Sequence, residues 1–315
     1  MELGEKIATR EAYGSALVEF AEKYDFVVMD ADLAEATKTV KFKKACPDRF
    51  FDCGIAEGNM VSTAAGIAAA GKTVFCSTFA MFAAGRAFEQ VRNSVGYPHL
   101  NVKIGATHAG ITVGEDGATH QCLEDLALMR VIPGMTVINP SDAVEAREAV
   151  RLALETKGPF YMRFGRFAVP VINDPAAYRM EIGRGVNLAE GKDVTIVATG
   201  ITVAMALEAR NLLAADGISA RVINIHTIKP IDREILIDAA KNTGAIVTAE
   251  EHNIIGGLGS AVAEVLAETL PVPVLRVGIR DTFGHSGTVP ALLEAYGLTP
   301  AAIAEKAKAA VGMKK

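Results

Sequence analysis

Short apolar runs alternate with longer amphipathic segments along the first half of the chain. The apolar runs predict strands at Phe26–Met29, Thr73–Cys76, Val102–Ala106, Thr136–Ile138 and Phe160–Met162. The segments between them have helical periodicity and lie near Ala8–Glu22, Asn59–Ala70, Ala80–Val95 and Asp142–Glu155. Several strand runs are continuously apolar, as parallel strands buried on both faces are. The pattern predicts an α/β sheet covered by helices on both sides.

The alternation stops between Pro170 and Asp193 and then resumes. The interrupted stretch is rich in glycine and contains Asn173-Asp174-Pro175, which is typical of a linker. Beyond it, the pattern predicts strands at Val194–Ala198, Arg221–Ile225, Ala245–Ala249 and Val274–Val277. Helices are predicted at Thr202–Ala214, Asp232–Lys241, Gly259–Thr269 and Pro300–Val311. We therefore expect an α/β protein with one domain at residues 1–170, a linker at 171–193 and a smaller α/β domain at 194–315.

Composition narrows the functional classes. A length of 315 residues suits two domains, and a net charge of −5 without a basic stripe argues against nucleic-acid binding. The most apolar stretch, Val61–Gly85, is interrupted by Lys72 and consists mostly of small residues, so no membrane role is expected. Met1–Lys6 shows no leader pattern and the four cysteines form no C-x-x-C pair, which favours a reducing cytoplasm without disulfides or a zinc site.

The segment Phe51–Met60 places Glu57 between an apolar lead-in and a helix of small residues. A carboxylate at a strand-to-helix junction faces the sheet edge at which α/β proteins bind ligands. A carboxylate at the start of a helix also complements the helix dipole. From this segment alone, both interpretations of Glu57 stay open.

The segment Thr107–Gln121 follows a predicted strand directly and is the most specific signal in the chain. It holds His108 and His120, two acids and three glycines. Glycines let the backbone turn tightly near a ligand, and histidine suits proton transfer near neutral pH. The spacing does not match a zinc site, so no metal ligand is assigned. The alternative is a structural loop with capped turns.

Phe79 and Phe82 lie three residues apart and would share one face of a helix. Such a pair usually belongs to the core, although it can also form a stacking surface for a flat heterocycle. By itself, the pair favours the core interpretation.

Together and in order, these segments resemble the thiamine-diphosphate-dependent transketolase family over nearly the whole chain. Gly114–Gln121 is close to the family's G-E-D-G-P-T-H-Q, with Ala118 at the usual proline. Ile55-Ala56-Glu57 is similar to the segment with the cofactor-activating glutamate, and Thr78–Phe82 to the aromatic pyrimidine pocket. Further similar segments are Ala31-Asp32-Leu33, Glu250–Asn253 and Gly256–Gly259. The resemblance implies a pyrimidine-binding domain followed by a transketolase C-terminal domain.

One part of a full-length transketolase has no counterpart here. The family's N-terminal domain holds Mg²⁺ and the diphosphate with a G-D-G motif and a downstream asparagine, and this chain has no G-D-G. The resemblance therefore implies the C-terminal subunit of a split transketolase. A separate N-terminal subunit would hold most of the metal and the diphosphate, with α₂β₂ as the expected heterotetramer.

The resemblance also implies an activity and residue roles. The expected reaction is thiamine-diphosphate-dependent transfer of a two-carbon ketol unit from a ketose phosphate to an aldose phosphate, as in the pentose phosphate pathway. Glu57 would activate the cofactor, whose pyrimidine would lie against Phe79 and Phe82. His108 and His120 are the implied proton-transfer residues.

The implied substrate contacts are His108, Asp116, Arg10 and Arg163, with the two arginines binding phosphate. Arg166 is expected mainly at the surface. The family often has a serine that touches phosphate four residues after the aspartate of A-D-L, where this chain has Ala36. Thr37 or Thr39 is the alternative at that place.

Three alternatives remain. 1-Deoxy-xylulose-5-phosphate synthase shares the Glu57 and Thr119-His120-Gln121 features but is normally one long chain. The β subunit of 2-oxo-acid dehydrogenases has a similar length and domain order but lacks this G-E-D-G-x-T-H-Q pattern. A non-catalytic paralogue is disfavoured because the candidate site residues are retained together, namely Glu57, His108, Asp116, His120 and Arg163. The preferred sugar, the divalent metal, the oligomeric state of the isolated chain and the role of the C-terminal domain stay open.

Overall fold

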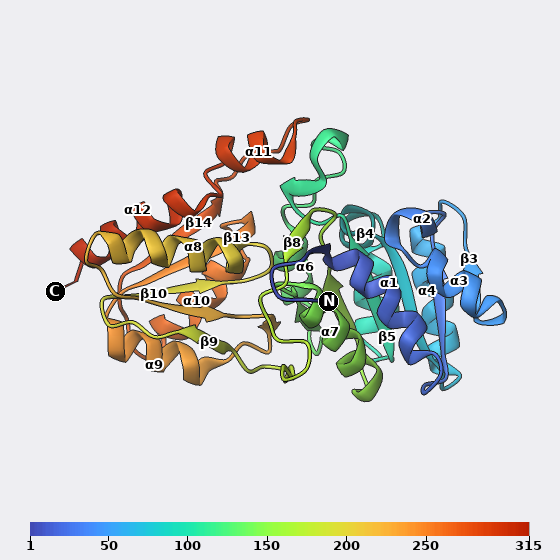
Figure 1. Ribbon diagram of the computed structural model, residues 1–315. Coiled ribbons are helices and arrows are strands. Elements are labelled where there is room, and N and C mark those ends of the chain that lie inside the picture. The colour runs from blue at the N-terminus through green and yellow to red at the C-terminus, as the bar shows by residue number, and fades with distance from the viewer. Residues whose placement is uncertain (315) are drawn as a thin grey trace.

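The apolar runs of the first half form one sheet in the computed structural model, which describes residues 1–314 (Figure 1). In spatial order its strands are β12 (Thr227–Lys229), β6 (Thr136–Ile138), β7 (Phe160–Arg163), β5 (Val102–Thr107), β4 (Thr73–Phe79), β2 (Phe26–Asp30) and β3 (Phe50–Asp52). Neighbouring strands pair in parallel except β12, which is antiparallel to β6. The carboxyl ends of β2, β4, β5 and β7 therefore meet at one edge of the sheet.

Helices cover both faces of this sheet. The helical segments of the first domain are α1 (Thr9–Phe20), α2 (Ala34–Thr37), α3 (Val40–Ala45), η1 (Pro47–Arg49), α4 (Glu57–Ala69), η2 (Phe82–Arg86), α5 (Phe88–Gln90), η3 (Val91–Gly96), η4 (Ile111–Asp116), α6 (Asp125–Arg130) and α7 (Ala143–Glu155). Phe26, Val28 and Phe75 pack with α1, α3 and α7 on one face. Val74 and Cys76 pack with α4, η3 and α6 on the other. Because alternate side chains enter two apolar cores, these strands read as continuous apolar runs.

The second half of the chain forms a smaller sheet. Its strands, in spatial order, are β14 (Val274–Ile279), β13 (Ile246–Asn253), β10 (Val194–Ala198), β11 (Ala220–Asn224) and β9 (Val186–Ala189). Only the pairing of β9 with β11 is antiparallel within this sheet over residues 1–314. The accompanying helices are α8 (Thr202–Ala215), α9 (Arg233–Thr243), α10 (Leu258–Ala267), α11 (Val289–Ala295) and α12 (Pro300–Gly312). The expected architecture of two α/β domains is confirmed.

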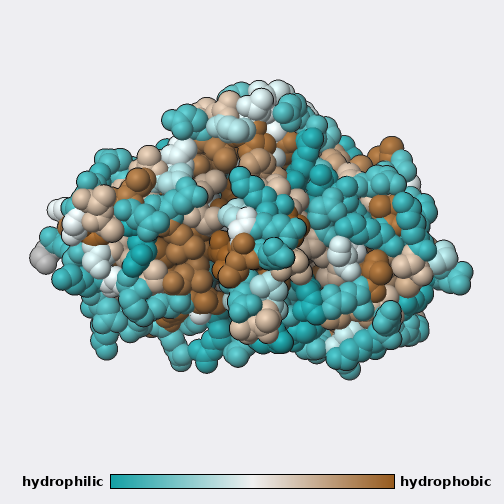
Figure 2. All heavy atoms as spheres, viewed as in Figure 1, coloured by the Kyte–Doolittle hydropathy of each residue, from teal (hydrophilic) through white to brown (hydrophobic). Residues whose placement is uncertain are grey.

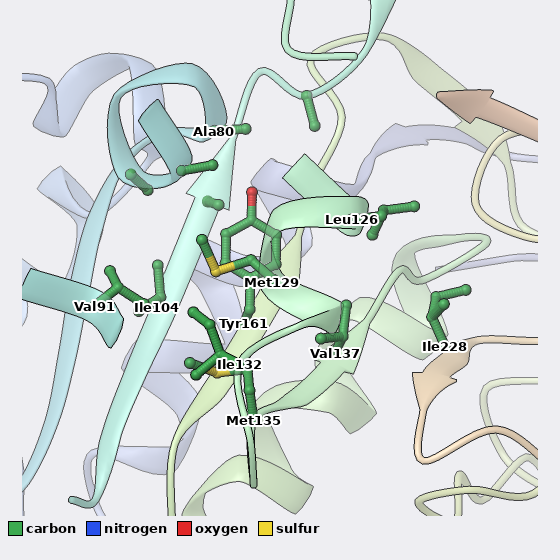
Figure 3. Close-up of a cluster of buried hydrophobic side chains, with 14 of the residues drawn as sticks. Ala80, Val91, Ile104, Leu126, Met129, Ile132, Met135, Val137, Tyr161 and Ile228 are labelled. Carbon is green, nitrogen blue, oxygen red and sulfur yellow. The ribbon is translucent and has the colours of Figure 1, made fainter. Parts of the chain in front are cut away.

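The boundary between the domains is more interwoven than the sequence pattern indicates. The segment expected as a linker contains β9, and β8 (Ala168–Pro170) at its start pairs with β1 (Lys6–Ala8) near the N-terminus. β12 lies beyond that segment in sequence, yet it completes the sheet of the first domain. Ile228 of β12 thereby joins the core around Val137 and Tyr161 (Figure 3). Figure 2 shows apolar side chains gathered in the middle of one face, where the two domains meet, between more polar ends.

The expected helical segment at Ala80–Val95 is present, with an interruption at Ala87, but most of it has wider turns than an α-helix. η2 and η3 have the wide turns of a π-helix and flank the single turn of α5. Such turns shift the direction of side chains relative to a regular α-helix and are frequent at functional sites. In a separate observation, none of the helices within residues 1–314 combines the length and apolarity needed to cross a membrane.

Candidate active site

The candidate residues lie at the edge of the larger sheet where parallel strands end. β4 ends at Phe79, β5 ends at Thr107 just before His108, and α4 begins at Glu57. Chain segments that leave this edge converge, which is why α/β proteins bind ligands there. The fold therefore brings together side chains from three separate parts of the sequence.

Glu57 is the first residue of α4, and its side chain is 5% exposed. Its Oε1 accepts a hydrogen bond from Nη1 of Arg86 over 3.2 Å. The Arg86 guanidinium carbon also lies 4.0 Å from the centroid of the Phe82 ring, a cation–π contact. A carboxylate, a cation and an aromatic face thus meet at the start of α4.

Four rings form one aromatic cluster beside this carboxylate. Phe79 stacks on Phe82 with 5.6 Å between centroids and on His108 with 3.8 Å. His120 meets Phe82 edge-on at 5.5 Å and Phe79 at 6.2 Å. The two phenylalanines are therefore not a closed core pair, because both are in contact with the histidines of the Thr107–Gln121 segment.

His108 is buried and held from both sides of its ring. Nη1 of Arg10 lies 2.9 Å from Nε2, and the Thr107 hydroxyl lies 2.9 Å from Nδ1. Since a guanidinium can only donate, Nε2 accepts the bond from Arg10 and Nδ1 carries the ring hydrogen. Burial, together with the positive charges of Arg10, Arg166 and Lys38, lowers the pKa of His108 to about 3. His108 is thus neutral near pH 7 and presents an acceptor to Arg10.

Arg10 connects this cluster to the Ala36 segment. Its Nη1 also donates to the Ala36 carbonyl over 2.8 Å, so the residue that replaces the family's serine lies at the site through its backbone. Thr37 and Thr39 do not take the serine's place in this structure. Both hydroxyls are buried and donate to Oδ2 of Asp30, at 2.7 and 2.8 Å.

Asp116 and Arg166 form the rim of the site. Nη1 of Arg166 lies 3.3 Å from Oδ2 of Asp116 and donates to the Val113 carbonyl over 2.6 Å. The positive charge of Arg166 lowers the pKa of both His108 and Arg10, which places it near them. Arg166, expected mainly at the surface, therefore belongs to the rim of the site, near the Arg10 guanidinium.

Arg163 does not join this cluster. Its side chain is 3% exposed, and its Nε pairs with Asp125 over 2.8 Å. Its Nη2 donates to the backbone carbonyls of Cys122 and Glu251, which belong to different domains. These contacts commit Arg163 to the interior between the domains and do not favour the expected phosphate contact.

Two features of the site were not anticipated from the sequence. Arg86 lies four residues after Phe82, so only the helical spacing hinted at its contact with that ring. A cavity of about 640 Å³ lies beside the aromatic cluster and between the domains. Its lining includes Met81, Thr119 and Gln121 from the first domain and Asn253 and Phe283 from the second.

No group of three or more histidine, cysteine or acidic side chains suited to a metal occurs within residues 1–314.

Both halves of the chain match family models. Residues 5–171 match the transketolase pyrimidine-binding domain, and residues 183–303 match the transketolase C-terminal domain. Among solved structures, a split-gene transketolase described as an inactive β4 tetramer is 55% identical, with a TM-score of 0.91 over 99% of this chain and 100% of that one.

Curated relatives give the same picture. A Methanocaldococcus jannaschii protein, provisionally named as a transketolase C-terminal section, is 51% identical over 94% of both chains. A 6-deoxy-6-sulfo-D-fructose transketolase subunit of a Clostridium species is 47% identical over 92% of this chain and 90% of its own. Mouse transketolase is 40% identical over 98% of this chain, which spans 50% of that longer protein.

Proposed function

This chain belongs to the transketolase family, whose members use thiamine diphosphate, and on that premise we propose that it is the C-terminal subunit of a split transketolase. The observation that carries the proposal is the convergence of Glu57, the Phe79–Phe82 pair and both histidines at one sheet edge. The proposed reaction is transfer of a two-carbon ketol unit from a ketose phosphate to an aldose phosphate.

The residues of this site fit one part of thiamine diphosphate. The Phe79–Phe82 pair offers aromatic surface to a flat ring, and the nearby Glu57 carboxylate offers an acceptor. When bound, the cofactor supplies the carbanion chemistry that carries the two-carbon unit. Glu57 would hold a proton at the pyrimidine nitrogen, and Phe79 and Phe82 would orient the ring. We assign the diphosphate and Mg²⁺ mainly to the partner subunit.

The remaining residues would bind and orient the sugar phosphates. Arg10 and Arg166 would bind phosphate, and Asp116 would accept a hydrogen bond from a sugar hydroxyl. His108 is held neutral and both its ring nitrogens are bonded, to Arg10 and Thr107, so it would orient Arg10 toward the substrate, and His120 remains the candidate for proton transfer. The sugar itself stays open, because the Clostridium relative is named for a sulfonated sugar rather than a phosphorylated one.

The proposed partner is an N-terminal transketolase subunit in an α₂β₂ assembly. Two findings support it: this chain spans half of mouse transketolase, and a 55%-identical split-gene transketolase is described as an inactive β4 tetramer. An N-terminal subunit with a G-D-G motif and a downstream asparagine would complete the site.

The test is reconstitution with such a subunit, followed by an assay of ketol transfer from xylulose 5-phosphate to an aldose phosphate. Activity should require both chains, thiamine diphosphate and a divalent metal. Glu57→Gln should lower turnover by about 10²–10⁴-fold while the assembly still forms, because the amide cannot supply the proton. Glu22→Gln, the same change at an exposed position, is the matched control.

Near-normal turnover of Glu57→Gln would remove that residue from its role. Formation of a deoxyketose from pyruvate, or decarboxylation of a branched 2-oxo acid, would favour one of the two related enzymes over a transketolase. A complex that binds cofactor but transfers no two-carbon unit would favour the non-catalytic paralogue.

A further inference from the structure

The C-terminal domain reaches the candidate site through an extended arm, defined here as Asp281–Thr288 followed by α11. In Figure 1, α11 lies beside a helical loop of the first domain, above the body of both domains. That loop is Gly110–Gln121, and α11 packs directly against its η4 segment. The arm therefore contacts the segment that carries Asp116 and His120.

Gln121 joins the end of this loop to its beginning and to the arm. Its buried Nε2 donates to the carbonyls of Ile111 and Gly114, each at 3.3 Å, and to the His285 carbonyl at 3.0 Å. At Gly284, a Cβ would lie 1.8 Å from Oε1 of Gln121, so the arm has no room for a side chain there. One amide thus holds three backbone segments together.

Glu251 holds the other end of the loop from β13. Its buried Oε1 accepts a hydrogen bond from the Thr112 amide over 2.6 Å. A Cβ on Gly110 would lie 2.3 Å from the Glu251 carboxylate, which shows how closely the loop backbone approaches it. In addition, the backbone N–H of Asn253 donates to the Leu123 carbonyl over 2.7 Å.

The loop also depends on the C-terminal domain for its apolar contacts. Ile111 and Leu123, at its two ends, belong to a core cluster whose other buried members lie in the C-terminal domain, Ile279 and Leu292 among them. Between them, Gly114 and Gly117 have positive φ angles of 84° and 76°. Glycines lose more conformational freedom on ordering than other residues, so such a loop needs external contacts to hold one shape.

We propose that the C-terminal domain positions the active-site loop Gly110–Gln121, with Gln121 and Glu251 as positioning residues. The structural part stands on the contacts alone, whereas the effect on turnover rests on the proposed function. Without these contacts, Asp116 and His120 would sample many positions relative to the aromatic cluster.

The test changes both sides of the contact between Gln121 and the arm. Gln121→Met keeps the volume but removes the amide, and Gly284→Ala displaces that amide from the arm. In both full-length variants, backbone hydrogen exchange in residues 110–120 should be at least about tenfold faster than in wild type, with β4 and β10 unchanged. Thr195→Val is the matched control, since it removes a buried hydroxyl contact with Thr243 inside the C-terminal domain, away from the loop.

Unchanged loop exchange in both variants overturns the proposal, whatever the activity of the enzyme. In the reconstituted complex, both variants should lower kcat about 10- to 100-fold with unchanged cofactor affinity, because Glu57 and the phenylalanines do not lie on the loop. Faster exchange with unchanged kcat would overturn the positioning role. If the wild-type complex shows no ketol transfer, the proposed function fails. The exchange experiment would still decide whether the C-terminal domain holds the loop Gly110–Gln121 in place.

Discussion

Asp125 and Arg163 form a buried ion pair within the first domain, where Arg163 also contacts the Glu251 carbonyl of the C-terminal domain. Oδ2 of Asp125 accepts hydrogen bonds from Arg163 and from the Tyr161 hydroxyl, each over 2.8 Å. Burial lowers the pKa of Arg163, but the neighbouring carboxylates of Asp125 and Glu251 raise it more, so the guanidinium stays charged. Neither side chain can regain water if its partner is removed. Removing one partner should therefore destabilise the fold by more than the intact pair stabilises it.

Asp125→Asn should therefore lower the free energy of unfolding by about 3–5 kcal/mol, because it leaves the Arg163 charge buried and poorly compensated. Urea unfolding followed by circular dichroism would measure this. Lys72→Met, which breaks the exposed pair with Asp25, should change stability far less than Asp125→Asn, because solvent screens this pair. Similar small effects of both substitutions would contradict the structural role given to Arg163.

Glu250 makes stability depend on pH. Burial raises its pKa to about 7 from an ordinary 4.5, although the Leu258 and Gly259 amides donate to it. Because the folded pKa lies above the unfolded one, its contribution to stability is complete below about pH 4.5 and is lost as the pH rises through 7. The stability of wild type relative to Glu250→Gln should thus fall between pH 5 and pH 8, by about 3 kcal/mol at most. Denaturant titrations across this range would measure it, with Glu22→Gln, the same change at an exposed position, as the control.

At the residue scale, the sequence predicted which side chains gather at the sheet edge, but it did not predict where each arginine lies. Glu57, Phe79, Phe82, His108 and His120 follow strand ends, and a parallel sheet brings such ends together at one edge. The position of an arginine side chain depends instead on partners that are distant in sequence. Nothing local distinguishes Arg163, which pairs with Asp125, from Arg166, which faces the site.

α7 begins at a cap that also fixes the predicted linker. Oδ1 of Asp142 accepts from the Glu145 amide over 2.9 Å, and Oδ2 accepts from the Ile172 and Asn173 amides at 2.8 and 2.9 Å. An ordinary cap satisfies only the helix, so Asp142 does more than its position in the sequence suggests.

Asp142→Ala should lower the free energy of unfolding by more than the ~2 kcal/mol upper limit of an ordinary cap, because three backbone amides and the Asn173 side-chain amide lose an acceptor. Thr299→Ala is the comparison, since Thr299 caps only the Ala302 amide of α12, and it should lose about 1 kcal/mol. Thermal unfolding of both variants would rank them. Equal losses would show that the linker contacts of Asp142 contribute little.

At the element scale, long elements with a clear period were predictable and short ones were not. The runs that became β2, β4, β5 and β10 are apolar on both faces, which leaves a strong signal. β12 has three residues and exists because β6 offers it an edge, so its cause lies ninety residues away in sequence. The sequence pattern likewise predicted a helix at Ala80–Val95 but not the wide turns of η2 and η3.

At the scale of the whole molecule, each domain lacks part of its own core. The core around β5 and β7 includes Ile223, Ile225 and Ile228, which come from the C-terminal half. The core of the C-terminal domain includes Ile111 and Leu123, which come from the first half. The two domains should therefore behave as one cooperative unit, since neither can bury its apolar surface alone.

The full chain should accordingly unfold in a single calorimetric transition. A fragment of residues 1–193 should not unfold cooperatively at the unfolding temperature of the full chain. Without β12, the fragment exposes the edge of β6 and the surface that Ile228 covers, which favours association through the open strand. Ile228→Ala in the full chain should lower that single transition, with a loss of about 2–5 kcal/mol, and leave it undivided. If the fragment instead unfolded cooperatively at the temperature of the full chain, the first domain would be self-sufficient. The C-terminal domain could then act on the site only through its local contacts with the loop, those of the arm and of Glu251, and hydrogen exchange in residues 110–120 would have to be independent of global stability.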